Sequence, residues 1–502
     1  MTNMRVAIIG AGLSGLAAGC YARMNDHQAI IFDQLGWPGG LARSWNREGF
    51  RMDPGPDLIW GHEQGTSTHV LLRELGVFPR RGVSLVRWGV TDEKGQRKVE
   101  ITSPLKDLER ELKRMAPADV DLIEDAMDAC SSMEAGGLLD TLASVPSDLG
   151  GLSTSLSVRW KERRYLSYLR GAWTEPMAEW SERFQDPFLQ RMMSSLCAPE
   201  SPAWLGMAML SLATKGELAR LDDGADGLVG SLVDRYMSLG GRFGLRSMVK
   251  EIVVEGDEVK GLRLSDGTIE EAERVITASD GREVIYRMLD RRFLDDEIER
   301  RHREWKPSTP QVSVSIGTSR PMEGLLPMAT VLLDSPLAMG TTPNLSMLVR
   351  SYDSSGGYAP AGKGLVCATL KSDWQFWYKL RALDRRMYEE EKARVGGEIL
   401  KRLELLLPGL SQETELVEVS TPFSAWKVNL GHEGAPSGWS LTEEAMSSRT
   451  IRTLPGLKGL YMAGPWAVPA LGTQGCMFTG KHAVQKMCHD EGRAFKAIAP
   501  LG

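Results

Sequence analysis

The chain has 502 residues and a formal net charge of −6 at pH 7, with 42% apolar and 25% charged residues. This length predicts two to three domains, and this composition is typical of a soluble globular protein. The small acidic excess argues against nucleic acid or an anionic membrane as the main partner.

The six cysteines and seven histidines are scattered along the chain. Their spacing matches no zinc, iron–sulfur or disulfide framework, so we predict free thiols, no metal site and a reducing, cytoplasmic compartment. We expect no secretory signal, and no apolar run is long enough to span a bilayer. The most apolar segment, 203–213, predicts a buried helix, with a cavity-lining or membrane-dipping helix as the alternative.

The first element is a short apolar strand over residues 6–9, followed at once by Gly10-x-Gly12-x-x-Gly15 and a helix over 13–24. Such a continuous apolar run is typical of a parallel strand buried on both faces. The first glycine permits the tight turn, the second removes a side chain where a pyrophosphate approaches, and the third lets the helix pack close to the sheet.

A nucleotide phosphate would then bind the free N–H groups at the start of this helix, around Leu13 and Ser14. A second strand, 29–32, ends at Asp33, where a carboxylate binds a ribose diol. Strand, glycines, helix, second strand and terminal acid therefore occur in the order of a Rossmann-type nucleotide site.

Residues 38–44 read PGGLARS and distinguish FAD from NAD. Gly39 and Gly40 offer unobstructed backbone N–H groups, and Arg43 offers a fork for a phosphate. The run resembles the GG-x-x-R-S/T signature of the large GR2-type flavoprotein family, which includes amine oxidases, protoporphyrinogen oxidases and phytoene desaturases. Residues 50–56 resemble its F-x-x-D-x-G-P stretch. The resemblance implies that Gly39, Gly40, Leu41 and Arg43 bind FAD, although either run alone is also typical of a glycine-rich turn.

Residues 225–280 predict a return to the same domain, with a helix over 227–239 and strands near 247–254 and 259–264. This block resembles the family's "GG … G-V-x-x-x-G … A-x-D" stretch, which implies that backbone at Val249 pairs with the adenine. The alternative is an ordinary three-stranded meander.

The end of the chain resembles the family's C-terminal FAD motif, L-Y-x-x-G-D/E … G-x-P-G-x-x-x-S-G-R. Here a strand would end at Gly464, and a loop would lead to a helix over 481–487 whose N–H groups face the flavin pyrimidine. The resemblance implies that FAD contacts Gly464, Pro465, Gly472, Thr473, Gln474 and Gly475.

The sequence departs from that motif in three places. Pro465 replaces the usual acid and supplies neither a carboxylate nor an N–H. Residues 470–471 read Ala-Leu in place of a glycine pair, and Gln474 replaces the usual proline. These departures predict a reshaped wall over the flavin.

Two further runs narrow the resemblance. Residues 421–439 are similar to a "T-P-x-T … G-x-x-x-G" segment, and residues 461–466 to "Y-M-A-G-Q-W". Both are features of bacterial flavoproteins related to phytoene desaturase, carotenoid isomerase and retinol saturase. The resemblance implies redox chemistry on an apolar, often unsaturated small molecule.

The implied fold class is α/β: a Rossmann-type FAD-binding domain with an inserted α+β substrate domain. The FAD-binding domain is expected to be discontinuous, over 1–80, 216–305 and 450–502. The substrate domain would comprise 81–215 and 306–449. Helices are predicted over 105–115, 119–133 and 388–407, and strands over 310–317 and 345–351.

Candidate substrate-pocket residues are Trp466, Cys476 and Trp426. An aromatic-lined apolar tunnel is one interpretation of the 14 tryptophans, and ordinary core packing is the other. For Cys476, inert packing is the simpler interpretation. No general base is visible in the sequence.

The family implies hydride transfer to or from flavin N5, which desaturates or saturates a C–C bond. A redox-neutral isomerase or cyclase, an amine oxidase and a non-catalytic flavin-binding protein are the alternatives. A plain NAD-dependent dehydrogenase is disfavoured, because the GG-x-x-R and C-terminal runs would then have no role. Peripheral membrane contact and oligomeric state stay open.

Overall fold

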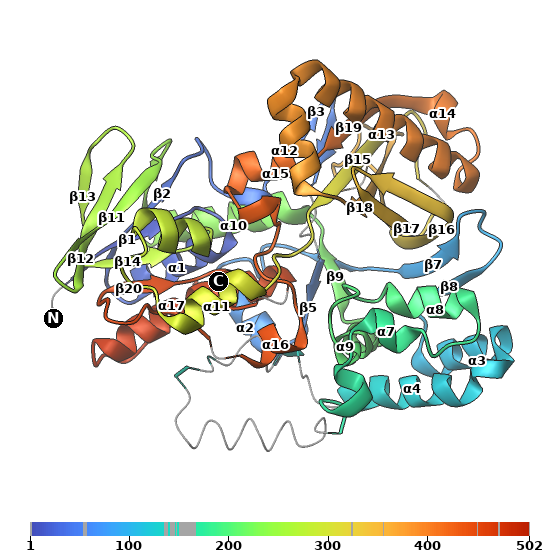
Figure 1. The fold of residues 1–502 in the computed structure, drawn as a ribbon, viewed down its shortest axis with the longest axis horizontal. Helices are drawn as coiled ribbons and strands as arrows, with labels where there is room; N and C mark the ends of the chain where they lie inside the picture. Colours follow the sequence, from blue (N-terminus) through green and yellow to red (C-terminus); the bar gives the residue numbers. More distant parts are fainter. Residues whose placement is uncertain are drawn as a thin grey trace.

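The computed structural model describes most of the chain as two sheet-based layers with helices around them (Figure 1). The described residues are 3–53, 58–134, 139–140, 146, 148–149, 167–322, 325–354, 356–448, 450–469 and 472–500. No helix within these ranges is long and apolar enough to cross a membrane. The motif residues 54–57 and 470–471 lie outside them.

The first layer is a five-stranded parallel sheet with the strand order β10-β2-β1-β14-β20. Its strands are β1 (Arg5–Ile9), β2 (Gln28–Asp33), β10 (Arg242–Leu245), β14 (Arg274–Thr277) and β20 (Leu460–Met462). The apolar run of β1 is buried on both faces, as its sequence predicts. Segments far apart in the chain therefore end at one carboxyl edge.

Helices cover one face of this sheet, and a small antiparallel sheet covers the other. The helices are α1 (Leu13–Met24), α10 (Gly224–Ser238) and α17 (Gly472–Asp490), and they share one apolar core. The small sheet joins β11 (Val249–Glu255), β12 (Glu258–Leu264) and β13 (Ile269–Glu271). The predicted helix and strands of residues 225–280 are thus present.

The boundary predicted for the last helix was wrong, because α17 begins at Gly472 and not at residue 481. Its glycines lower the intrinsic helix propensity of this stretch. Packing compensates: a Cβ on Gly480 would lie 2.3 Å from the carbonyl oxygen of Ser14 in α1, so the two helices approach at their backbones.

The second layer is a seven-stranded, mostly antiparallel sheet with the order β19-β15-β18-β17-β16-β7-β8. Its strands are β7 (Trp88–Asp92), β8 (Lys98–Glu100), β15 (Gln311–Thr318), β16 (Met328–Met339), β17 (Thr342–Tyr352), β18 (Gly364–Lys371) and β19 (Thr414–Ser420). Helices α12 (Trp374–Leu383) and α13 (Arg385–Leu406) pack on one face, above the sheet in Figure 1.

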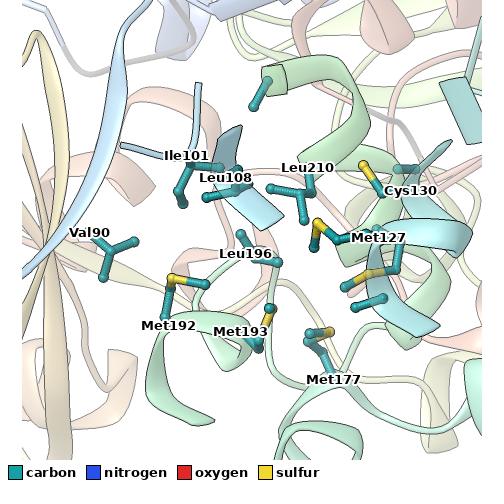
Figure 2. Close-up of a cluster of buried hydrophobic side chains, with 14 of the residues drawn as sticks. Val90, Ile101, Leu108, Met127, Cys130, Met177, Met192, Met193, Leu196 and Leu210 are labelled. Atoms are coloured by element: carbon teal, nitrogen blue, oxygen red, sulfur yellow. The ribbon is translucent and has the colours of Figure 1, made fainter. Parts of the chain in front are cut away.

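A methionine-rich helical cluster packs on the other face of this sheet. It contains α3 (Leu105–Met115), α4 (Val120–Glu134), α7 (Met177–Ser181), α8 (Pro187–Ser194) and α9 (Ala203–Lys215). Figure 2 shows Leu196 among the apolar side chains of this cluster, with Met192 and Met193 beside it. Helix α9 is buried along nearly its whole length, as the apolar run at 203–213 predicts.

Short elements connect the layers. A three-stranded sheet pairs β5 (Leu58–Trp60) and β6 (Val83–Leu85) with β9 (Leu218–Leu221), and β3 (Trp45–Arg47) pairs with β4 (Phe50–Met52). Further α-helices within the described ranges are α2 (Ser67–Glu74), α11 (Asp296–Glu304), α14 (Leu410–Glu413), α15 (Pro422–Asn429) and α16 (Glu443–Ser447). Where the two layers meet, β5, β9 and α15 help to line one cavity.

Candidate functional site

One cavity of about 650 Å³ opens at the carboxyl edge of the parallel sheet and continues toward the methionine-rich helical cluster. In doubly wound α/β folds, ligands bind at this edge. The predicted residues that line it are Gly10, Gly12, Leu13, Ser14, Asp33, Gly39, Gly40, Leu41, Val249, Pro465, Trp466, Gly472, Thr473 and Cys476. The structure therefore brings the two terminal motifs together around a common space.

The three glycines of the first turn have different surroundings. Gly10 has φ +100°, and its N–H donates to the Phe32 carbonyl at 2.8 Å, which closes the tight turn. A Cβ on Gly15 would lie 1.9 Å from the Gly10 carbonyl oxygen, so helix and strand touch there. A Cβ on Gly12 would meet no atom of the described residues within 4 Å. Gly12 thus leaves open the space into which a phosphate would fit.

Asp33 ends β2 at the cavity wall. Its carboxylate accepts the N–H groups of Ala11 and Leu35, both at 2.8 Å. Burial raises the pKa of this carboxyl above its usual value. A carboxylate has about four acceptor positions, so acceptors remain for a diol after these two bonds.

The Gly39-Gly40 turn forms the second wall beside Gly12. Both residues have positive φ, and the Gly39 N–H donates to the Ala11 carbonyl at 2.8 Å. The structure does not place Arg43 in the described wall, because its guanidinium lies 4.6 Å from the ring centroid of Trp37. A phosphate contact by Arg43 stays a prediction.

The C-terminal segment enters the site between α1 and α17. The Gly464 N–H donates to the Thr479 hydroxyl at 2.8 Å, and Gly464 itself is not part of the described cavity wall. Gly472 and Thr473 do line the cavity, so the positive end of α17 opens onto it.

Gln474 and Gly475 lie inside α17 and are buried behind the described wall. Gln474 is fully buried, and its amide donates to the Trp60 carbonyl at 3.4 Å. The residue that replaces the usual proline therefore joins the start of α17 to β5, a contact that the sequence does not predict.

Of the three pocket candidates, the structure places two in the cavity wall. Trp466 lies edge-on to Trp439, with ring centroids 4.8 Å apart, and its carbonyl accepts the indole N–H of Trp439 at 2.9 Å. Burial raises the pKa of the Cys476 thiol to about 11, which makes it a poor nucleophile. Trp426 lies outside the described wall, in an aromatic cluster with Trp374 and Phe423.

Several residues that line the cavity were not predicted from the sequence. Leu58, Trp60, Leu196, Leu205, Met209 and Leu441 give one half of the cavity an apolar wall. The position of Asp280, just after a parallel strand, was a usable signal, because such positions lie at the ligand-binding edge. The apolar residues gave no such signal, since they come from unconnected helices, strands and loops.

Asp280 is a buried acid in this wall. Its two carboxylate oxygens accept the N–H groups of Glu283 at 2.8 Å and His432 at 2.7 Å. Burial raises the pKa of this carboxyl from 3.8 to about 6, against the opposing effect of those hydrogen bonds. The group therefore titrates near neutral pH.

A raised carboxyl pKa makes stability depend on pH. The Asp280 carboxyl contributes to the free energy of unfolding through its raised pKa. This contribution is fully present below pH 3.8 and is lost as the pH rises through about 6. Relative to an Asp280→Asn variant, we expect the free energy of unfolding to fall by about 2 kcal/mol between about pH 4 and pH 7. Urea unfolding of both proteins across this range measures the difference, and a pH-independent difference would contradict the assignment.

Comparison with known proteins identifies the site. The family described as flavin-containing amine oxidoreductases matches residues 13–488. The chain belongs to this family. It is an FAD-dependent oxidoreductase, which confirms the cofactor and the enzyme class expected from the sequence.

Relatives of this flavoprotein carry different activities. A phytoene desaturase (lycopene-forming) from Pseudescherichia vulneris is 26% identical, and the match covers 55% of the chain and 56% of that protein. The chain thus matches little more than half the length of that relative. The chloroplastic prolycopene isomerase of Arabidopsis thaliana is 21% identical over 97% of the chain and 82% of its own length.

A solved structure supports the fold class. Wild-type putrescine oxidase bound to putrescine has a TM-score of 0.60 and 16% identity, covering 97% of the chain and 99% of that protein. The expected α/β fold with a Rossmann-type domain is confirmed. The cavity also suits FAD, because the open space at Gly12 lies beside the N-terminus of α1 and the first residues of α17, Gly472 and Thr473, line the same cavity.

Proposed function

We propose that FAD lies extended along the polar half of this cavity and that the apolar half holds the substrate. Val249 and Asp33 would hold the adenosine, Gly12 the pyrophosphate, and the start of α17 the flavin. The observation that supports this most directly is the continuity of the cavity, which leads from the Gly10–Gly15 turn to an apolar chamber.

We propose that this flavoprotein desaturates or saturates a C–C bond of an apolar, unsaturated small molecule. When bound, FAD supplies hydride exchange at N5. The leucine and methionine wall orients an apolar chain and excludes water. The positive end of α17 favours negative charge on the ring. The desaturase relative favours this reaction class.

A redox-neutral isomerase is the second candidate. The observation in its favour is the extent of the match to prolycopene isomerase, which covers 97% of the chain. An amine oxidase is less well supported, because an ammonium group is costly to bury beside the leucines and methionines of the chamber.

We propose the same two-domain division that the sequence predicts. The strands of the parallel sheet come from 1–80, 216–305 and 450–502. Those of the seven-stranded sheet come from 81–215 and 306–449. We propose that the first group of segments binds FAD and that the second completes the substrate chamber.

The test starts from the purified protein. We expect a flavin absorbance spectrum and release of a cofactor with the mass of FAD. Anaerobic incubation with polyene extracts should bleach the flavin and give a product two hydrogens lighter, or reduced enzyme should give one two hydrogens heavier. A product of unchanged mass would favour the isomerase. Protein that stays colourless after FAD addition would contradict both.

A further inference from the structure

Three buried tryptophans form a row that leads away from the cavity. Trp466 lines the cavity, and its ring lies edge-on to that of Trp439, with the ring centroids 4.8 Å apart. Trp439 in turn lies edge-on to Trp305, with the centroids 5.7 Å apart. The three side chains belong to one small apolar cluster, and each is at most 8% exposed. Such spacings are typical of aromatic rings in contact, so an electron can pass from each indole to the next.

The outer end of this row is placed to lose a proton. Trp305 directly follows α11, and its indole N–H donates to the carboxylate of Glu444 in α16 at 3.2 Å. The Glu444 side chain is 55% exposed. A hydrogen bond from Arg300 holds the pKa of Glu444 below its usual value, so the carboxylate is ionised at neutral pH. An indole that has lost an electron is a strong acid, and Glu444 can accept its proton and pass it to water.

Neighbouring cations make this proton loss necessary at one position and not at the other. The rings of His302 and Trp439 have centroids 5.0 Å apart, and burial lowers the pKa of His302 to about 4, so this histidine is neutral near pH 7. The Arg301 guanidinium, in contrast, lies 4.7 Å from the ring centroid of Trp305 and opposes a positive charge there. Transfer of the N–H proton to Glu444 removes that charge, because the resulting tryptophan radical is neutral.

The other aromatic side chains that line the cavity in the described part of the chain are Phe32 and Trp60. A phenylalanine ring is not readily oxidised. The Trp60 indole is, but no other aromatic ring packs against it among the described residues. An electron taken from Trp60 would return at once, whereas one taken from Trp466 can be replaced from Trp439. Only the row that begins at Trp466 therefore offers a path from this cavity wall toward the surface within the described ranges.

We propose that Trp466, Trp439 and Trp305 form a relay through which light reduces the bound flavin. This inference rests on the proposed position of the flavin at the start of α17. On illumination, Trp466 gives one electron to the oxidised flavin and regains one from Trp439, which regains one from Trp305. The Trp305 N–H proton passes to Glu444, and a proton from water reaches the flavin. A thiol then returns a hydrogen atom to Trp305, so two rounds give fully reduced flavin and one disulfide.

The test illuminates FAD-loaded protein with blue light, without oxygen or substrate and with dithiothreitol as the thiol. Loss of flavin absorbance measures reduction, and electron paramagnetic resonance of samples without the thiol measures the tryptophan radical. We expect the wild-type flavin to bleach. We expect Trp439→Phe to retain FAD but to lose most of the bleaching and of the radical signal, because a ring remains while the electron donor is gone. Trp305→Phe should show the same loss, and it carries the test if Trp439→Phe fails to bind FAD.

Trp204→Phe is the matched control. Trp204 is also buried, and its indole N–H also donates to a carboxylate, that of Glu443, at 3.2 Å. Its side chain is not part of the described cavity wall, and its ring packs on none of the relay rings within the described ranges. This variant should bleach like wild type.

Three results would overturn the inference and leave the proposed function standing. They are wild-type protein that binds FAD but does not bleach, either FAD-loaded relay variant bleaching at the wild-type rate, and an equal loss of bleaching in Trp204→Phe. Wild-type protein that binds no FAD would instead contradict the proposed function.

Discussion

Replacing Gly12 with valine is expected to abolish FAD binding while the fold stays stable. Gly12 has φ −74° and ψ −177°, an extended conformation that valine adopts without strain. A Cβ there would meet no atom of the described residues within 4 Å, so the backbone and its neighbours leave room for the substitution to begin. The added side chain would occupy the space where the pyrophosphate approaches the start of α1. We expect FAD affinity to fall by about 100-fold or more.

Gly15→Val is the matched variant, three residues further along the same turn. Here the Cβ would lie 1.9 Å from the Gly10 carbonyl oxygen, and backbone cannot give way cheaply. We expect a loss of about 3 kcal/mol or more in the free energy of unfolding. The flavin-to-protein ratio and the urea unfolding midpoint of the apoproteins separate the two effects. Gly12→Val protein that keeps a full complement of FAD would show that the cofactor lies elsewhere.

The contrast between these two glycines shows which parts of the site the sequence predicts well. The roles of Gly10, Gly12 and Gly15 depend on neighbours close in the chain, and the order of strand, turn and helix determines those neighbours. Asp33 is predictable for the same reason, since it ends the adjacent strand. The fold class followed from these local patterns and from the family resemblance.

The rest of the site depends on side chains that meet only in the folded chain. Arg43 stacks on Trp37, and Trp426 joins the aromatic cluster of α12 and α15, although both follow recognisable motifs. Leu196, Leu205 and Met209 line the cavity, although no family motif covers their segment. Periodicity and motif spacing carry no information about such encounters.

Disrupting the contact between α1 and α17, which come from opposite ends of the chain, is expected to have a large effect on stability. Gly480 lies where α17 crosses α1, and a Cβ there would be 2.3 Å from the Ser14 carbonyl oxygen and 2.8 Å from the Ala18 nitrogen. Both are backbone atoms, so Gly480→Ala must push the helices apart. The adjacent Thr479 hydroxyl, which holds the Gly464 N–H at 2.8 Å, would move with them. We expect a loss of about 3 kcal/mol or more in stability, together with a loss of FAD.

Gly397→Ala isolates the packing contribution, because both glycines lie inside helices and both variants gain the same intrinsic helix propensity. Gly397 is exposed on α13, and a Cβ there would meet nothing within 4 Å in the described part of the chain. That variant should be about 0.5 to 1 kcal/mol more stable than wild type and retain FAD. Urea unfolding and flavin content of the two variants measure the difference directly. If Gly480→Ala proved as stable as Gly397→Ala, the close approach of α1 and α17 would be wrong, and with it the convergence of the two terminal motifs on one cofactor.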